Sequence, residues 1–236
     1  MIKLENVKKF YASRCVLDIP ELTLFAGKRY ALIGPNGSGK STLLRLLSGV
    51  LRQEEGSIAI AEDRKEDIGY MPQRPYAYGF TVLKNVQIAL PRRQRDANAL
   101  AKAALEEVGM MALQKEKGNH LSGGEIQRMA FARMLVRERK LLLLDEPTSA
   151  TDIAGTELLE RALLCYHEKN TCTLVFATHS LAQAERLADE IIFLDHGRIL
   201  ACGTVEDVLY APENEQIRAF VKLWQLEKFP HQQAEK

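Results

Sequence analysis

The stretch Gly34-Pro35-Asn36-Gly37-Ser38-Gly39-Lys40-Ser41-Thr42 decides the fold expected for this chain. It fits the pattern G-x-x-x-x-G-K-[ST] and lies between an apolar run ending at Ile33 and a segment of helical spacing from Lys40. In this context the glycines allow a tight turn, so that backbone N–H groups and the positive helix N-terminus face an anion. We therefore expect a phosphate-binding loop, in which Lys40 reaches the terminal phosphates of a nucleotide and the Ser41 hydroxyl binds Mg²⁺.

A second motif is the apolar run from Leu141 to Leu144, which ends in two carboxylates, Asp145 and Glu146. In an open α/β sheet, ligands bind at the carboxyl ends of the strands, and this acidic pair emerges there. Asp145 suits a hold on Mg²⁺, and Glu146 suits a general base that polarises the attacking water. A solvated acidic turn is the alternative, which the neighbouring phosphate loop disfavours.

A third motif, Leu121-Ser122-Gly123-Gly124-Glu125, opens a helical stretch that runs towards Arg137. Ser122 with Glu125 three residues later is a capping box, which has a purely structural purpose. The two glycines weaken a helix start for no structural gain. They do let an anion approach bare N–H groups at a helix N-terminus, so they favour a second phosphate-binding surface.

Strand and helix signals alternate on both sides of these motifs, which predicts an α/β fold with a parallel sheet. Helices are expected over Ala97 to Leu113 and near 155–168 and 180–189, and 55–57 is expected to be a turn. Ile191–Asp195 and Arg198–Cys202 are expected to form a hairpin at the sheet edge. The remaining expected strands are Ile2 to Val7, 17–24, 30–33, 58–60, 68–71, 141–144 and 173–178.

The chain of 236 residues has a net charge of +1 and 46% hydrophobic residues, as expected of one compact domain, or of a domain with a subdomain, that has a full core. The chain lacks the excess of positive charge that would indicate a nucleic-acid partner. No apolar run approaches the roughly 18 residues that cross a bilayer, and the N-terminus lacks a signal-peptide pattern. The four dispersed cysteines are expected to be free thiols. We therefore expect a cytosolic protein, free or docked on a partner.

The three motifs, in this order, resemble the ATP-binding subunits of the ABC (ATP-binding cassette) family over nearly all of residues 1–210. LSGGE separates this family from other phosphate-loop ATPases. The resemblance implies a P-loop NTPase (RecA-like) core with an N-terminal antiparallel β subdomain and an α-helical subdomain inserted at about 74–138. A C-terminal helix and tail, 211–236, would complete the chain. The helix carries one apolar face, which favours packing on the domain over binding a partner; the tail is expected to fray.

The resemblance also implies the site. ATP and Mg²⁺ would be the ligands, and two copies would pair head to tail, so that Ser122, Gly123 and Gly124 contact the γ-phosphate held by the partner chain. The remaining roles carried over are adenine stacking for Tyr11, with Phe10 as the rival, Mg²⁺ and water sensing for Gln73, and γ-phosphate contact for His179. The segment 149–152 matches the family's D-loop except at Thr151, where leucine is usual, and it retains Asp152.

By the same resemblance, the chain would power a membrane-spanning permease from the cytoplasmic face, with a solute-binding protein acting indirectly. The aromatic stretch 75–83 lies where the family receives the permease, with ordinary core packing as the alternative. A compact single cassette favours an importer, with tungstate or molybdate ranked above phosphate or polar amino acids. Two other hypotheses are a non-transport ABC ATPase and an ATP-gated dimerisation module. The intact Glu146 and His179 disfavour the second.

Overall fold

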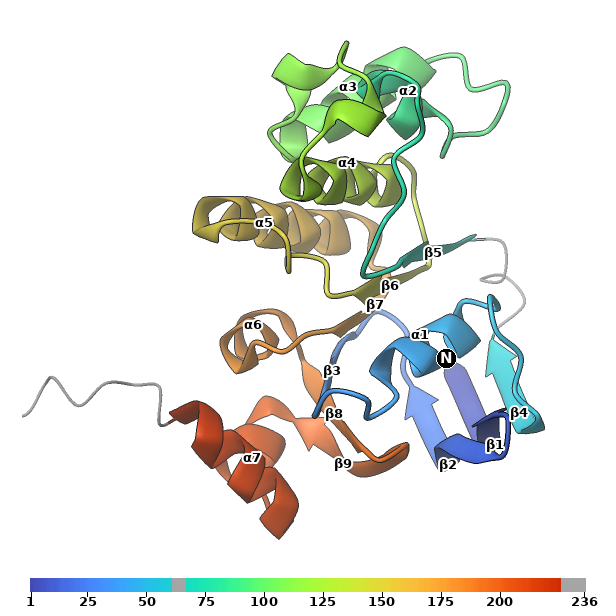
Figure 1. The fold of residues 1–236 in the computed structure, drawn as a ribbon, viewed down its shortest axis with the longest axis vertical. Helices are drawn as coiled ribbons and strands as arrows, with labels where there is room; N and C mark the ends of the chain where they lie inside the picture. Colours follow the sequence, from blue (N-terminus) through green and yellow to red (C-terminus); the bar gives the residue numbers. More distant parts are fainter. Residues whose placement is uncertain (61–66, 226–236) are drawn as a thin grey trace, which may run out of the picture.

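The computed structural model describes residues 1–60 and 67–225, with side chains described as far as residue 223. Within these residues the larger sheet has six strands (Figure 1). Their order is β5 (Ile68–Met71), β6 (Leu141–Asp145), β7 (Thr173–Ala177), β3 (Arg29–Ile33), β8 (Glu190–Asp195) and β9 (Arg198–Thr204). The pairings from β5 to β8 are parallel, and β8 and β9 form an antiparallel hairpin. The predicted parallel sheet and its edge hairpin are both confirmed.

The central strands are apolar because both faces of the sheet are covered. All five residues of β6 are buried. Leu142 and Leu144 join one hydrophobic cluster, whereas Leu141 and Leu143 join the other. The strand thus divides its side chains between two cores by the two-residue period of a strand, and only its last residue, Asp145, supplies a polar group.

A second, three-stranded antiparallel sheet has the order β2 (Arg14–Leu24), β1 (Ile2–Tyr11) and β4 (Glu55–Ile60). In β1 the buried positions run Ile2, Leu4 and then Val7, so the alternation slips by one residue. The slip occurs at Asn6, which has a φ of 49°, and the pairing with β4 is irregular at the same place.

The predicted turn at 55–57 is wrong, because these residues belong to β4. Gly56 has a φ of 79° and lies where β1 bulges, so its backbone mimics a turn inside a strand. A Cβ on Gly56 would lie 2.2 Å from the Asn6 carbonyl oxygen. The glycine therefore marks a close approach of two strands rather than a chain reversal.

Replacing Gly56 with alanine is expected to lower the free energy of unfolding by about 2–3 kcal/mol, because a strained φ adds to a clash with backbone. Urea denaturation of the two proteins measures the difference. Ser57→Ala, one residue along the same strand and exposed, is the matched control and should change stability by less than about 0.5 kcal/mol. Equal stabilities for the Gly56 variant and the parent would contradict the proposed close packing.

The first six α-helices along the described chain occupy three regions of the fold (Figure 1). Helix α1 (Lys40–Leu47) follows β3, α5 (Ile153–Asn170) and α6 (Leu181–Leu187) connect the parallel strands, and α2 (Val82–Gln87), α3 (Ala97–Glu107) and α4 (Gly123–Leu135) form one end of the molecule. Short helical turns lie at Met111–Leu113, Gly118–His120 and Glu206–Tyr210. The single helix expected over 97–113 is wrong, since it ends at Glu107 just before Gly109 turns the chain with a φ of 65°.

Helix α7 (Glu215–Gln225) packs on the domain, as predicted from its apolar face. Ile217 and Val221 are buried, and the Phe220 ring meets Phe193 edge-on with centroids 5.1 Å apart. The expected frayed tail after Pro230 lies outside the described residues. In the part of the chain that the structure describes, no helix has the length and apolar content to cross a bilayer.

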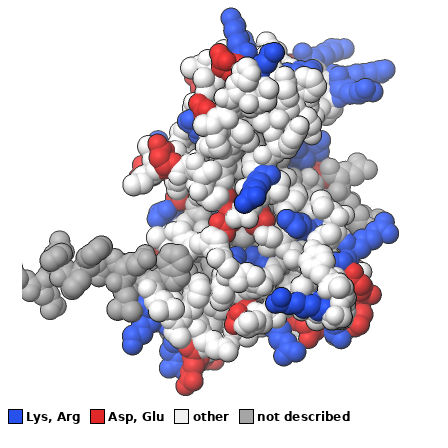
Figure 2. Space-filling model, in the orientation of Figure 1, with Lys and Arg blue, Asp and Glu red and all other residues white. Residues whose placement is uncertain are grey.

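Charge of both signs is distributed over the visible face, and one group of Lys and Arg side chains lies over the helical end of the molecule (Figure 2). The loop between α2 and α3 contributes to this region with exposed Arg92, Arg93 and Arg95. All four cysteines are free, as expected.

Candidate active site

The glycine-rich loop joins β3 to α1 at the carboxyl end of the central sheet, as its sequence predicts. Gly34, Gly37 and Gly39 have φ angles of 140°, 78° and 110°, so all three adopt backbone conformations that other residues avoid. A Cβ on Gly34 would lie 1.9 Å from the Leu194 carbonyl oxygen of β8. The loop therefore lies directly against the neighbouring strand, where only glycine fits.

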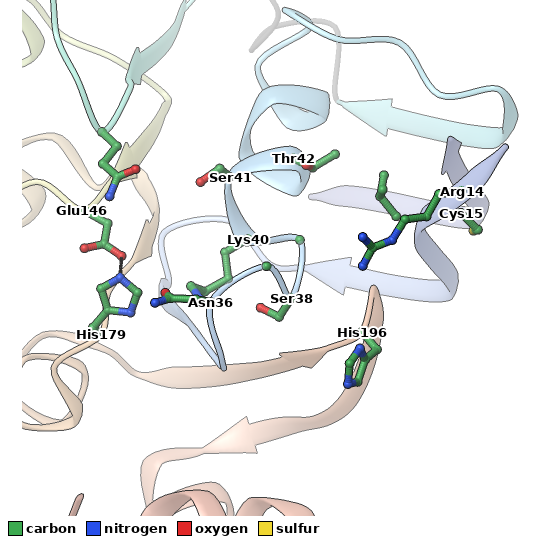
Figure 3. A pocket seen from close by; sticks show the side chains of 14 residues that line it. Arg14, Cys15, Asn36, Ser38, Lys40, Ser41, Thr42, Glu146, His179 and His196 are labelled. Carbon is green, nitrogen blue, oxygen red and sulfur yellow. Dashed lines mark ion pairs between the residues drawn. The ribbon is translucent and has the colours of Figure 1, made fainter. Parts of the chain in front are cut away.

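A cavity of about 530 Å³ opens over this loop (Figure 3). The loop and the start of α1 form its floor, and Gln73, Glu146 and His179 reach it from the ends of three other segments. The predicted site residues that line it are Asn36, Gly37, Ser38, Gly39, Lys40, Ser41, Thr42, Gln73, Glu146 and His179. The fold thus gathers residues separated by as much as 143 positions, counted from Asn36 to His179, around one space large enough for a nucleotide.

Lys40 is held at the centre of the loop. Its Nζ donates hydrogen bonds to the carbonyl oxygens of Gly34 at 2.7 Å and Pro35 at 3.0 Å. Burial lowers the pKa of this amine, and the nearby carboxylates of Glu146 and Asp145 oppose that shift. A buried cation near the positive end of a helix makes a strong site for a phosphate.

Asp145 ends strand β6 beneath the cavity and is almost fully buried. The Ser41 hydroxyl donates to its Oδ1 at 3.0 Å, while its Oδ2, also buried, has no hydrogen-bond partner among the described residues. Burial raises the pKa of this carboxyl, and the Ser41 hydrogen bond opposes the shift. A hydroxyl and an orphaned carboxylate oxygen are hard ligands of the kind that Mg²⁺ prefers, so these residues fit the ion.

Glu146 lies one residue further, with its side chain in the cavity and paired with the Nε2 of His179. Burial raises the pKa of Glu146 to about 7, which the positive charge of Lys40 partly offsets. Burial also lowers the pKa of His179. Both shifts favour the neutral form of the side chain concerned. At neutral pH the pair is therefore closer to a hydrogen bond than to an ion pair.

Four residues that the sequence analysis did not single out also line the cavity: Arg14, Cys15 and Val16 at the start of β2, and His196 in the β8–β9 turn. Figure 3 shows Arg14 and His196 on the side of the loop opposite His179. Their signal in the sequence is weak because all four lie outside the motifs, three at the start of a strand and one in a hairpin turn.

Tyr11 does not line the cavity in the structure. It ends β1, is 46% exposed, and has the Lys9 ammonium 5.7 Å from its ring centroid. The rival Phe10 is absent from the lining as well. Adenine stacking by either residue therefore stays a prediction.

Ser122 begins α4 away from the cavity of its own chain, in agreement with a surface that would serve a second copy. The predicted capping box is confirmed, with the Ser122 amide donating to Glu125 Oε2 at 2.8 Å and the Glu125 amide to Ser122 Oγ at 3.4 Å. Gly123 faces open space, but a Cβ on Gly124 would lie 2.8 Å from the Ala150 carbonyl oxygen. The inference that both glycines lack a structural purpose is therefore wrong for Gly124.

The segment 149–152 leads from the acidic pair into α5. Asp152 caps that helix by accepting the Gly155 amide at 2.7 Å. The Thr151 hydroxyl donates to the Thr148 carbonyl oxygen at 2.8 Å. This is the position where leucine is usual in the family that the sequence resembles. Threonine therefore closes the loop by a local hydrogen bond.

The aromatic stretch 75–83 is largely exposed, so the alternative of ordinary core packing is wrong for Tyr76, Tyr78 and Phe80. The rings of Tyr76 and Tyr78 lie 5.0 Å apart, and the Arg133 guanidinium lies 5.4 Å from the centroid of the Tyr78 ring. An exposed cluster of rings held in place is typical of a protein-binding surface.

Taken together, the glycine-rich loop, the buried Lys40 and the acidic pair at the end of β6 define a phosphate-loop nucleotide hydrolase. A family model described as ABC transporter matches residues 17–149. The tungstate uptake system ATP-binding protein of Peptoclostridium acidaminophilum is 38% identical over 205 residues, which span 84% of this chain and 96% of that protein. The sulfate/thiosulfate import ATP-binding protein of Nocardia farcinica is 37% identical over 94% of this chain and 70% of that protein.

Solved structures of ABC proteins have a similar fold. A dimeric ATP-binding cassette in a post-hydrolysis state, bound to ADP and phosphate, has a TM-score of 0.79 at 28% identity over 88% of this chain and 100% of that chain. The ATP-bound structure of a bacterial Atm1-family ABC exporter has a TM-score of 0.83 at 26% identity over 99% of this chain and 42% of that chain. The chain belongs to the ABC transporter family, as an ATP-binding subunit that hydrolyses ATP to drive transport.

Proposed function

We propose that this chain is one of two identical motor subunits of an importer for a small inorganic oxyanion, with tungstate or molybdate as the first candidates. The observation that supports the cargo class most is the 38% identity to a tungstate uptake ATP-binding protein over 96% of that protein's length. The sulfate/thiosulfate import relative supports the same class, since its named cargo is also an oxyanion.

In the proposed reaction, the loop from Gly34 to Thr42 binds the phosphates of ATP and Glu146 acts as the general base towards the attacking water. His179, paired with Glu146, orients that carboxylate and reaches the γ-phosphate. Ser41, Asp145 and Gln73 would hold Mg²⁺, which neutralises phosphate charge when it is bound. Ser122, Gly123 and Gly124 would complete the site of a second copy, so the active species is a dimer closed by ATP.

The exposed rings of Tyr76, Tyr78 and Phe80 are the proposed docking surface for the membrane-spanning permease. The chain would then lie at the cytoplasmic face of the membrane, and a solute-binding protein would act on the permease from the other side. We further propose that residues 1–210 form the ATPase domain, with a helical subdomain at about 74–138, and that 211–236 are a C-terminal helix and tail.

The cargo can be tested in proteoliposomes that contain this chain together with its proposed permease and solute-binding protein. We expect ATP-dependent accumulation of tungstate or molybdate, with little accumulation of phosphate or polar amino acids. Vesicles with the Glu146→Gln chain are the matched control and should not accumulate the anion, because they bind ATP without turnover. Accumulation of an amino acid in place of the oxyanions would contradict the proposed cargo and leave the ATPase assignment intact.

A further inference from the structure

The loop between β6 and α5, residues 146–151, is held by a side chain from the helix that Ser122 begins. Gln127 of α4 is 1% exposed, and both its amide nitrogen and its amide oxygen form hydrogen bonds with this loop. Its Nε2 donates to the Glu146 carbonyl oxygen at 2.8 Å and to Ser149 Oγ at 3.3 Å. Its Oε1 accepts the Ala150 amide at 2.7 Å. A buried amide with this set of partners fixes the loop at three points.

The loop begins at a strained residue. Glu146 has a φ of 54°, in the left-handed region, which is unfavourable for a non-glycine residue and persists only where surrounding contacts hold it. Its amide donates to the Ala177 carbonyl oxygen at 3.1 Å, and its carbonyl oxygen accepts from Gln127 and from Ser149 Oγ, the latter at 3.1 Å. These bonds set the planes of the peptides on both sides of Glu146, and with them the direction in which its side chain leaves the backbone.

A second contact joins the same helix to the same loop. The missing Cβ of Gly124 leaves room for the Ala150 carbonyl oxygen, which would lie only 2.8 Å from that Cβ. The helix thus meets the loop at its first turn through Gly124 and one turn later through Gln127. The close packing at Gly124 and the buried amide of Gln127 both fix the position of the loop relative to α4.

We infer that Gln127 is a positioning residue that holds the Glu146 main chain, and thereby aims the Glu146 carboxylate into the ATP cavity. The inference rests on the proposed role of Glu146. It links each chain's hydrolytic carboxylate to its own Ser122 helix, so that a displacement of α4 relative to the sheet moves the carboxylate as well.

The test is Gln127→Met, which keeps the side-chain volume and removes the hydrogen bonds. We expect kcat for ATP hydrolysis to fall by about 10- to 100-fold, because a misplaced catalytic group loses rate without losing substrate. The KM for ATP should stay within about twofold, since the phosphate loop is untouched. If the methionine variant does not fold, Gln127→Leu replaces it, because leucine also removes the hydrogen bonds without placing a charge in this buried position, and the same fall in kcat is expected.

Gln183→Met is the matched control for a structural effect. Gln183 is also buried, at 3% exposure, but its Nε2 donates to Thr148 Oγ1 at 3.0 Å and to Glu160 Oε1 at 2.9 Å, not to Glu146. Both variants should lower the unfolding temperature to a similar degree, while the Gln183 variant keeps kcat within about threefold of the parent. Equal losses of kcat in the two variants would overturn the inference.

A double variant separates positioning from a general loss of structure. If Gln127 acts through Glu146, adding Gln127→Met to Glu146→Gln should slow the residual single-turnover hydrolysis by no more than about twofold. A further fall as large as that in the parent chain would show that Gln127 acts by another route. Normal kcat in the Gln127 variant beside a slow Glu146→Gln chain would defeat this inference alone, whereas normal turnover in Glu146→Gln would defeat the proposed function and this inference with it.

Discussion

Glu146→Gln is expected to bind ATP as tightly as the parent chain while its turnover falls by at least about 100-fold, the usual contribution of a general base. The amide has the shape of the carboxyl but cannot accept a proton from the attacking water. Binding should persist because the loop from Gly34 to Thr42 and the amine of Lys40 remain in place. A fluorescent ATP analogue measures affinity, and phosphate release in a single turnover measures the chemical step.

Glu157→Gln serves as the matched control for this substitution. Glu157 is exposed on α5, and its replacement should leave both affinity and turnover unchanged. Turnover close to normal in the Glu146 variant would remove this residue from the chemistry, and a proportional loss of ATP affinity would show that it acts in binding instead.

The residues that the sequence predicts best are those whose chemistry is local. The phosphate loop needs glycines, a lysine and a hydroxyl within nine consecutive positions, and β6 needs an apolar run followed at once by Asp145 and Glu146. Both patterns are fixed by one strand end and one turn, so the sequence contains all that is required to recognise them. The same holds for the capping box of Ser122 and Glu125, which the structure reproduces.

The residues that the sequence does not reveal act over longer separations. Gln127 reaches Glu146 across 19 positions and Gln183 reaches Thr148 across 35. His196 enters the cavity wall because Gly197 donates its amide to the Ser38 carbonyl oxygen at 2.9 Å. Nothing in the local sequence announces such contacts, since they depend on the order of strands in the sheet. The turn prediction at Gly56 is wrong for a related reason: in the sequence, a glycine required by a neighbouring strand looks like a glycine required by a turn.

Ser122→Arg is expected to reduce ATP hydrolysis below about 1% of the parent rate, because a bulky cation would occupy the surface offered to the partner's γ-phosphate. The isolated variant chain should still bind ATP, since Ser122 lies outside the cavity of its own chain. The loss of an N-cap costs only about 1 kcal/mol, which does not account for such a fall in rate.

Mixing two inactive chains tests the shared site directly. In a dimer of one Ser122→Arg chain and one Glu146→Gln chain, the phosphate loop and Glu146 of the first chain face the intact Ser122 of the second. One complete site is thereby restored, and the other carries both defects. Random pairing in a symmetric dimer makes half of the dimers mixed, so hydrolysis should recover to roughly one quarter of the parent rate.

The recovery also distinguishes a local defect from misfolding, because an unfolded Ser122→Arg chain could not supply the working Glu146. Titrating one variant into the other should give a rate that rises to a maximum near equal amounts and then declines. If subunit exchange is verified and no activity returns, the two halves of the site do not come from different chains. If Ser122→Arg alone hydrolyses ATP at the parent rate, even when the chain is dilute and monomeric, then the phosphate loop and acidic pair suffice without a second copy.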